Sequence, residues 1–299
     1  MRMIFIFIDG LGIGEENENK NPVRKAHAEN IRHLLENPCT IAADACLGVP
    51  GLPQSATGQT AIFTGINASS VLGRHMSGQP TQTLRNIIEN SNLFKELIKM
   101  GFSVTNSNVY REEYLLKMLD PKERRCRPSV TSVMTMSAGV RFRTVEDYNW
   151  GKGIYHDVTG EVLHKSGYDV KLISVEDAAE RLYSISRDYD FTLYEHFMSD
   201  IIGHTADMEL AVKEVILLDT FLGKLLDKLD LDEDILMITS DHGNIEDISV
   251  KTHTFNKVPV IILGDVQEAI KLRIKSLTDI MPAVIDIFKN RRYGREADE

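Results

Sequence analysis

Short apolar runs alternate with amphipathic segments along most of this chain of 299 residues. The apolar runs have the length of buried strands and cover residues 3–8, 40–45, 102–105, 191–197, 235–239 and 258–263. Between them, apolar residues recur at helical spacing in residues 27–36, 82–100, 175–187, 208–229 and 277–289. This alternation predicts an α/β fold, namely a three-layer α/β/α sandwich with a mostly parallel central sheet.

The alternation is lost in one internal stretch, residues 106–174. This stretch holds a run rich in Ser, Thr and Met, together with Trp150, the only tryptophan of the chain. We therefore expect a small inserted cap at residues 106–174, and a core domain built from residues 1–105 and 175–299.

The composition excludes several classes of protein. A formal net charge of -10 argues against a general nucleic-acid binder and against docking to anionic membranes. The three cysteines (Cys39, Cys46 and Cys126) are too few and too scattered for a disulfide framework, and are typical of reduced thiols. The first apolar run is only about six residues long, so it indicates a strand and not a signal peptide. No run approaches the roughly twenty apolar residues of a membrane span. We expect a cytoplasmic protein.

Three of the predicted strands are followed by an aspartate. "IFIFID" leads to Asp9, "FTLYEHFMSD" to Asp200 and "ILMITSD" to Asp241. In open α/β sheets, ligands bind outside the carboxyl ends of the strands, where these acids would gather. Three carboxylates in one place repel one another strongly unless a cation lies among them.

Histidines accompany these acids. His204 stands four residues after Asp200, His242 adjoins Asp241, and His253 lies in "KTHT". Each motif alone is weak, and "SDHG" by itself is equally a good turn sequence. Together the three Asp and three His residues predict a metal centre, because carboxylate oxygen and imidazole nitrogen are typical ligands of zinc and manganese. They suffice for two ions if one further group joins them.

A further group is available in "GLPQSATGQTAIFTG". Ser55 precedes the apolar run 61–63, which reads as a helix, and Ser is a favoured N-cap residue. A second interpretation is catalytic, since a hydroxyl at a helix N-terminus lies in positive potential and a metal ion there would help to ionise it. The residues alone leave both interpretations open.

These motifs resemble those of a known family. "DGLGIG", "SATG" before "TG", "DIIGHT", "SDHGN" and "THTFNKVP" occur in the order found in the alkaline phosphatase superfamily, and they cover about two-thirds of the chain. Within it, the chain is similar to the branch of the cofactor-independent phosphoglycerate mutases and phosphopentomutases.

The resemblance implies a division of the ligands between two ions. One ion would be held by Asp200, His204 and His253, and the other by Asp9, Ser55, Asp241 and His242. Ser55 would be the nucleophile. Relatives place that hydroxyl three residues before a Gly or Asn and ten before the Gly of "TG", and Ser55 stands so to Gly58 and Gly65, whereas Thr57 and Thr60 do not fit both spacings.

The chain also departs from these mutases. They carry a large second domain rich in Arg and Lys, for which only residues 106–174 are available here, and they often have His at the position of Gln59. The sequence therefore predicts a two-metal phosphohydrolase or phosphotransferase that acts on a small phosphate ester through a phosphoserine at Ser55. A phosphomutase is the first alternative, and a catalytically inactive binding protein on the same fold is the second.

Other positions and properties carry weaker expectations. Arg74, His75 and His156 are candidates for substrate binding. A polar loop explains Arg74 and His75 equally well, and a surface loop explains His156 better. The cluster Arg124, Arg125 and Arg127 is either a phosphate grip or a solvated basic run. The expected cofactors are two divalent ions, zinc or manganese, with magnesium as a further candidate. The expected partner is a small phosphorylated molecule, and the oligomeric state is left open.

Overall fold

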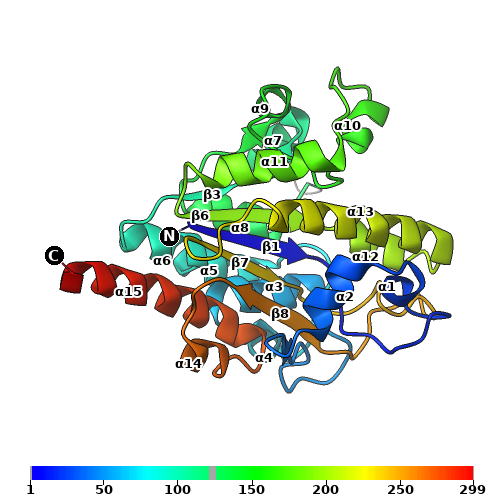
Figure 1. The fold of residues 1–299 in the computed structure, drawn as a ribbon, viewed down its shortest axis with the longest axis horizontal. Helices are drawn as coiled ribbons and strands as arrows, with labels where there is room; N and C mark the ends of the chain where they lie inside the picture. Colours follow the sequence, from blue (N-terminus) through cyan, green and yellow to red (C-terminus); the bar gives the residue numbers. More distant parts are fainter. Residues whose placement is uncertain (1, 121–125, 299) are drawn as a thin grey trace.

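A six-stranded sheet lies at the centre of the computed structural model, which describes residues 2–120 and 126–298, with side chains to residue 290 (Figure 1). The strand order is β2-β8-β7-β1-β6-β3. β1 runs parallel to β6 and β7, and β3 runs parallel to β6, whereas β8 is antiparallel to β7 and β2. The strands are β1 (Arg2–Ile8), β2 (Ile41–Ala43), β3 (Val104–Asn106), β6 (Phe191–His196), β7 (Asp234–Thr239) and β8 (Val258–Leu263).

Both faces of this sheet are covered, because the side chains of a strand alternate between its two faces. Phe5 and Phe7 of β1 join one core cluster, and Ile4 and Ile6 join the other. The first cluster includes side chains of α3 (Ser55–Thr64), α6 (Leu93–Lys99), α8 (Val130–Ser137) and α15 (Ile280–Asp298). The second includes side chains of α2 (Glu29–Glu36), α11 (Val175–Ser186) and α13 (Met208–Leu226). The predicted α/β/α sandwich with a mostly parallel sheet is thereby confirmed.

One predicted helix was wrong. Residues 82–100 form two helices, α5 (Gln82–Asn90) and α6, with a break at Ser91 and Asn92. The side chain of Asn92 accepts a hydrogen bond from the backbone N–H of Lys95 at 3.1 Å and donates one to the carbonyl of Ile88 at 2.7 Å. Asn92 thus caps the second helix and satisfies the end of the first, which a helical apolar pattern alone does not show.

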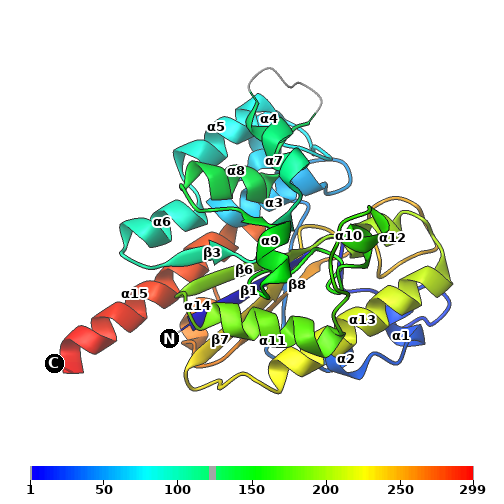
Figure 2. The ribbon, with the colours of Figure 1, turned by 90° about the horizontal axis from the view of Figure 1, so that it is seen from above.

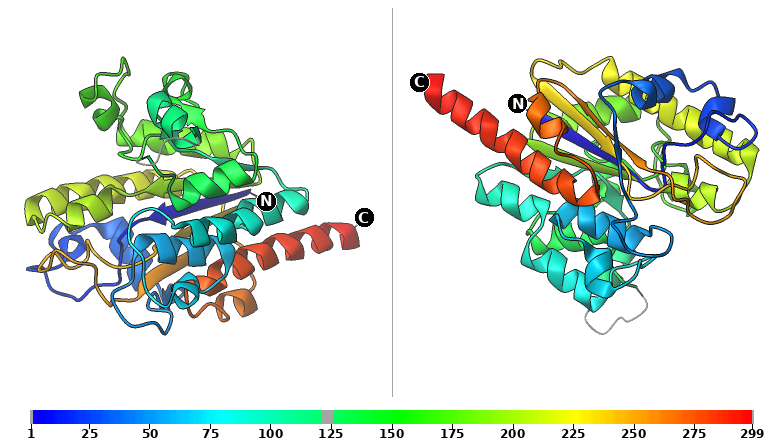
Figure 3. Two further views of the ribbon diagram at one scale, coloured as in Figure 1. Left: turned by 180° about the vertical axis from the view of Figure 1, so that it is seen from behind. Right: turned by 90° about the horizontal axis from the view of Figure 1, so that it is seen from below.

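Residues 106–174 make little contribution to the main sheet. Only Asn106 belongs to it, while β4 (Val109–Tyr110) and β5 (Arg143–Thr144) pair with each other. In the left view of Figure 3, the green segments that include α7 (Glu112–Leu119), α9 (Val145–Asn149) and α10 (Glu161–Lys165) lie along the top of the molecule. Side chains of α9 and α10 join the second core cluster, on the side of the sheet that α13 covers. α8, in contrast, packs with Phe5 on the other side. The domain boundaries at 106 and 174 stay a prediction, and by its packing α8 belongs with the core.

The register of the parallel strands brings the carboxyl ends of β1, β6 and β7, and the loops that follow them, to one edge of the sheet. Ile8 of β1 lies opposite His196 of β6, and Phe7 lies opposite Thr239 of β7. The loops after these strands therefore begin next to one another, and Figure 2 shows β1 and β6 side by side. The remaining elements are α1 (Pro22–Lys25), α4 (Ala68–Leu72), α12 (Met198–Gly203), α14 (Glu268–Lys271) and η1 (Leu277–Asp279).

No helix in the described residues is both long enough and apolar enough to cross a membrane.

Phe5 gives a test of the core. Its ring is fully buried and lies 5.8 Å, centroid to centroid, from the rings of both Phe63 and Phe191. Phe5→Ala should lower the free energy of unfolding by about 3–5 kcal/mol, because it removes buried surface and leaves a cavity. Leu116→Ala, at a side chain that is 73% exposed, should change it by less than about 0.5 kcal/mol. Urea unfolding followed by circular dichroism measures both, and equal effects would contradict the described packing.

Candidate metal centre

Two of the three predicted acids follow their strands as expected. Asp9 comes directly after β1, and Asp241 and His242 follow β7 after one intervening residue, Ser240. The expectation for Asp200 was wrong in one respect, because β6 ends at His196 and Asp200 lies in the first turn of α12. The helix still delivers the predicted pair, since residues four apart share one helical face and His204 follows the last residue of α12.

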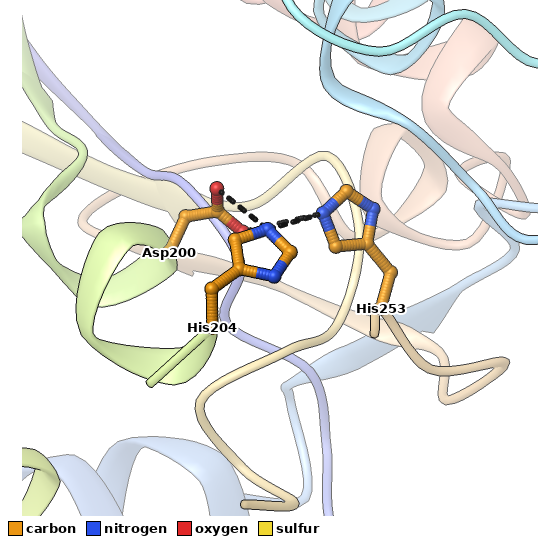
Figure 4. A group of neighbouring side chains, drawn as sticks. All are labelled: Asp200, His204 and His253. Carbon is orange, nitrogen blue, oxygen red and sulfur yellow. Dashed lines mark hydrogen bonds and ion pairs between the residues drawn. The ribbon is translucent and has the colours of Figure 1, made fainter. Parts of the chain in front are cut away.

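Asp200, His204 and His253 form a first group of ligand atoms (Figure 4). Asp200 Oδ2 lies 3.4 Å from Nε2 of His204, and Asp200 Oδ1 lies 3.4 Å from Nε2 of His253. The two Nε2 atoms are 3.2 Å apart. His253 is largely buried, and His204 is exposed toward solvent.

The backbone fixes the tautomer of these two histidines. Nδ1 of His204 lies 2.8 Å from the carbonyl oxygen of Lys251, and Nδ1 of His253 lies 2.8 Å from that of Pro53. A carbonyl oxygen only accepts, so each Nδ1 carries the hydrogen and donates it. In the neutral rings each Nε2 then carries a lone pair and no hydrogen. Two such nitrogens facing each other at 3.2 Å repel unless a cation lies between them. Ring nitrogens oriented in this way are typical of metal ligands.

A second group surrounds His242. Its Nε2 lies 3.3 Å from Asp9 Oδ1, 3.6 Å from Asp241 Oδ2 and 3.0 Å from Ser55 Oγ. Asp9 Oδ1 is buried without a hydrogen-bond partner, which is costly unless a cation is bound there. Asp200 belongs to this group as well as to the first. The two groups adjoin, since the rings of His242 and His253 stack with centroids 3.7 Å apart.

Of the two interpretations of Ser55 that the residues left open, the N-cap is wrong. The N-cap of α3 is Gln54, and Ser55 is the first helical residue. Nδ1 of His242 faces the carbonyl of Gly243 at 3.4 Å, so its Nε2 is free to accept a hydrogen bond from the Ser55 hydroxyl. The hydroxyl therefore points toward the second group of ligands instead of capping the helix.

Burial and crowding perturb the acids and the imidazoles. Burial, together with the charges of Asp241 and Asp200, raises the pKa of Asp9 well above its usual value. Burial and the charge of Asp200 raise the pKa of Asp241 to about 7. Burial lowers the pKa of His242 to about 3, so this ring is neutral at neutral pH. At Asp200 burial acts to raise the pKa, but hydrogen bonds with His253 and Asn244 and the neighbouring imidazoles together lower it to about 2. A bound cation would relieve the repulsion among the acids.

Two amide side chains that the sequence did not assign support the acids. Gln59 Nε2 donates to Asp9 Oδ2 at 3.0 Å and reaches Asp241 Oδ2 at 3.3 Å. Asn244 Nδ2 donates to Asp200 Oδ1 at 2.6 Å. Both lie inside the motifs "SATGQ" and "SDHGN", and their position beside predicted ligands was the signal available for them.

A cavity of about 640 Å³ adjoins these groups. Asp9, Ser55 and Asp200 line one side of it, and its other walls include Tyr110, Tyr155, His156, Glu195 and Phe197. His156, a predicted substrate-binding residue, stacks on Phe197 with centroids 4.1 Å apart, and burial lowers its pKa to about 3. Glu195 was missed, although a charged residue inside a buried strand is costly and therefore informative. Burial raises its pKa to about 7.

The other candidates for substrate binding lie elsewhere. Arg74 is exposed, and neither it nor His75 lines this cavity. Both ring nitrogens of His75 are engaged, one with the Ser69 hydroxyl and one with the carbonyl of Val49, each at 3.1 Å. Arg124 and Arg125 lie outside the described residues. Arg127 lines a neighbouring cavity of about 1030 Å³ together with Arg111 and Lys117.

The chain has relatives among known proteins. The 2,3-bisphosphoglycerate-independent phosphoglycerate mutase of Clostridioides difficile (strain 630) is 35% identical over 133 residues, which are 41% of this chain and 26% of that protein. The mutase of the same name from Desulforudis audaxviator is 28% identical over 127 residues, 40% of this chain and 25% of that protein. The match thus spans about a quarter of the length of these curated relatives.

Solved structures share the fold. The PH0037 protein from Pyrococcus horikoshii superposes with a TM-score of 0.59 at 16% identity, covering 96% of both chains. The alkaline phosphatase of the Antarctic bacterium TAB5 superposes with a TM-score of 0.55 at 11% identity, covering 96% of this chain and 98% of that one. These comparisons bear out the resemblance drawn from the motifs. A family model described as the Metalloenzyme superfamily matches residues 1–291, so the chain belongs to that superfamily.

Proposed function

We propose that this chain is a two-metal phosphohydrolase or phosphotransferase that acts on a small phosphate ester through a phosphoserine at Ser55. The position of the Ser55 hydroxyl carries the proposal. It lies 3.0 Å from His242 Nε2, at the first residue of a ten-residue helix and on the wall of a cavity that Asp9 and Asp200 also line. A cavity of about 640 Å³ lies within the range of small-molecule sites.

The residues present fit two divalent ions. One ion would be held by Asp200, His204 and His253, since the Nε2 atoms of the two histidines face each other. The other would be held by Asp9, Ser55, Asp241 and His242, among which Asp9 Oδ1 has no hydrogen-bond partner. Oxygen and imidazole ligands suit zinc or manganese, with magnesium as a further candidate. Bound divalent ions supply Lewis-acid polarisation of the phosphoryl group and offset the charge of the phosphate and the acids.

The chain's own residues supply the nucleophile and its orientation. Ser55 Oγ would lose its proton and form a bond to phosphorus, while the bond from phosphorus to the ester oxygen breaks and that oxygen takes up a proton and leaves as the alcohol. The N-terminus of α3 carries positive potential, which favours the anionic phosphoryl group at that place. Gln59 holds the carboxylates of Asp9 and Asp241 by hydrogen bonds from one amide nitrogen. A water molecule would then cleave the phosphoserine and release phosphate.

Hydrolysis is favoured over the phosphomutase alternative by the surroundings of the cavity. A mutase must exclude water while the phosphoryl group returns to the substrate. Here only residues 106–174 are available to enclose the site, and the cavity beside Ser55 adjoins a larger one with which it shares Gln79, Arg111 and Tyr114 as wall residues. Such surroundings suit hydrolysis by water better than a sealed mutase site. Membership of the Metalloenzyme superfamily, in turn, favours an enzyme over an inactive binding protein.

The net charge and the free cysteines of the chain bear on the proposed partners and location of the enzyme. A small phosphorylated molecule is the proposed substrate, and the net charge of -10 disfavours nucleic acid and anionic membranes as partners. Cys39, Cys46 and Cys126 are free thiols, which suits the cytoplasm as the proposed location.

Metal removal and pH test the proposed ligands. Chelator-treated protein should take up two equivalents of zinc or manganese, measured by isothermal titration calorimetry. Binding requires the carboxylate of Asp241, whose pKa burial raises to about 7, so below that pH each binding event displaces its proton. The affinity should therefore rise with pH up to about 7, by about tenfold per pH unit for each displaced proton.

Asp241→Asn serves as the comparison for this titration. The amide needs no deprotonation and is a poorer ligand, so this variant should bind weakly at one of its two sites and show a shallower dependence on pH. Two equivalents bound with the wild-type pH profile would remove Asp241 from the ligand set.

Ser55→Ala tests the nucleophile. The hydroxyl caps no backbone group, so its loss should cost about 1 kcal/mol of stability or less, the value of one hydrogen bond. Turnover of p-nitrophenyl phosphate should fall by at least about a thousandfold, because the covalent route is removed. Thr60→Val, which removes another hydroxyl of α3, should keep most of the activity, because Thr60 Oγ1 donates to the carbonyl of Ala56.

The covalent intermediate gives an independent readout. Wild-type enzyme quenched in acid during turnover should carry phosphate on the peptide of residues 51–64, located by mass spectrometry. Phosphate on Thr57 or Thr60, or near-normal turnover of Ser55→Ala, would show that Ser55 is not the nucleophile.

A further inference from the structure

A buried carboxylate, that of Glu246, lies next to the metal centre and takes no part in either group of ligands. The side chain is only 1% exposed, although a buried acid is costly unless it is fully hydrogen-bonded. It belongs to "SDHGNIED", four residues after His242. Its four hydrogen bonds show what it does.

Each oxygen of this carboxylate accepts two hydrogen bonds. Oε2 accepts from the backbone N–H groups of Gly12 at 2.9 Å and Asn244 at 2.7 Å. Oε1 accepts from Thr254 Oγ1 at 2.6 Å and Asn256 Nδ2 at 3.0 Å. A carboxylate has about four lone-pair sites, so these four donors saturate it and leave none for a metal ion.

The four donors come from the three segments that carry most of the proposed ligands. Gly12 lies in the loop after Asp9, Asn244 follows Asp241 and His242, and Thr254 follows His253. The backbones of these segments also meet, through Ile245 N to Gly10 O at 2.9 Å and Thr254 N to Gly243 O at 3.0 Å. Among the described residues, Glu246 is the side chain whose hydrogen bonds join all three segments.

The glycines of two motifs make room for this carboxylate. A Cβ on Gly12 or on Gly243 would overlap Glu246 Oε1, and a Cβ on Gly14 would lie 2.9 Å from Glu246 Cγ. None of these three glycines has a positive φ, so space and not backbone conformation requires them. The alternating glycines of "DGLGIG" therefore include two that line the site of a buried acid.

We propose that Glu246 is the positioning residue of the metal centre, holding the three ligand-bearing segments in the arrangement that binds metal. The inference rests on the proposed ligands and not on the reaction that they serve. Partners that orient metal ligands commonly change metal affinity by about 10–100-fold when they are replaced.

Glu246→Gln is the direct test. An amide presents one acceptor and one donor, so some of the four donors would face an N–H group instead of an oxygen. Titration with Co²⁺ should show an affinity at least about tenfold weaker than that of the wild type. The visible absorption of bound Co²⁺, which reports ligand geometry, should change as well. Circular dichroism establishes that the variant is folded.

Asp219→Asn is the matched control. The Asp219 carboxylate accepts hydrogen bonds from Ile31 N at 2.8 Å and Asn30 Nδ2 at 3.0 Å, and so joins α13 to α2. Its replacement should lower stability in the same way but leave the affinity for Co²⁺ and the spectrum unchanged. A purely structural role of Glu246 would make the two variants alike.

Thr254→Val decides the matter if Glu246→Gln does not fold. It removes one of the four donors, and it should shift the affinity and the spectrum in the same direction by a smaller amount. A folded variant of either kind with wild-type Co²⁺ affinity and spectrum overturns the inference. Wild-type protein that binds no Co²⁺ would instead overturn the proposed metal ligands, on which this inference depends.

Discussion

The rest of this structure depends on one constraint, the electrostatic repulsion within its metal centre. Buried carboxylates repel one another there, and so do the lone pairs of two imidazoles that face each other. Asp9, Asp200 and Asp241 lie at one edge of a sheet whose two faces are covered, and there the charge of Asp200 makes ionisation of Asp9 and Asp241 more costly. The backbone adds to this, because the carbonyls of Pro53 and Lys251 fix the hydrogens of two histidines on Nδ1 and turn both Nε2 atoms inward. Such an arrangement is stable only with a proton or a cation between its members.

The sheet is what brings these groups together from distant parts of the chain. Parallel pairing of β1 with β6 and β7 aligns three carboxyl ends, and buried side chains on both faces keep the strands in register. Antiparallel β8 then returns from the same edge, so the segment with His253 reaches the site just before that strand begins. Helix α3 completes the arrangement by placing Ser55 at its first residue.

The sequence was sufficient for the parts that depend on local pattern. Asp9 and Asp241 could be placed because each directly follows an apolar run, and strand ends gather ligands in this kind of sheet. Asp200 was placed on the wrong element, since the apolar pattern does not show that β6 stops at His196 and that a helix begins there. Gln59 stood beside predicted ligands in the sequence, but its hydrogen bonds to Asp9 and Asp241 depend on residues far along the chain. Glu246 has near partners in Asn244, Thr254 and Asn256, but the apolar pattern does not show that it also reaches Gly12. Side-chain partners at such separations depend on the finished fold.

Asp200 is common to both ligand groups, and the rings of His242 and His253 that flank it are stacked. An ion bound by Asp200, His204 and His253 would therefore fix a carboxylate that also lies among the ligands of the other ion. The first ion bound would order ligands for the second, and it would also add a positive charge beside it. Occupancy of the two positions is thus coupled, and the sign of that cooperativity depends on whether ordering or charge repulsion is larger. A protein with this arrangement has no independent half-site, so a metal titration reports the pair and not either ion alone.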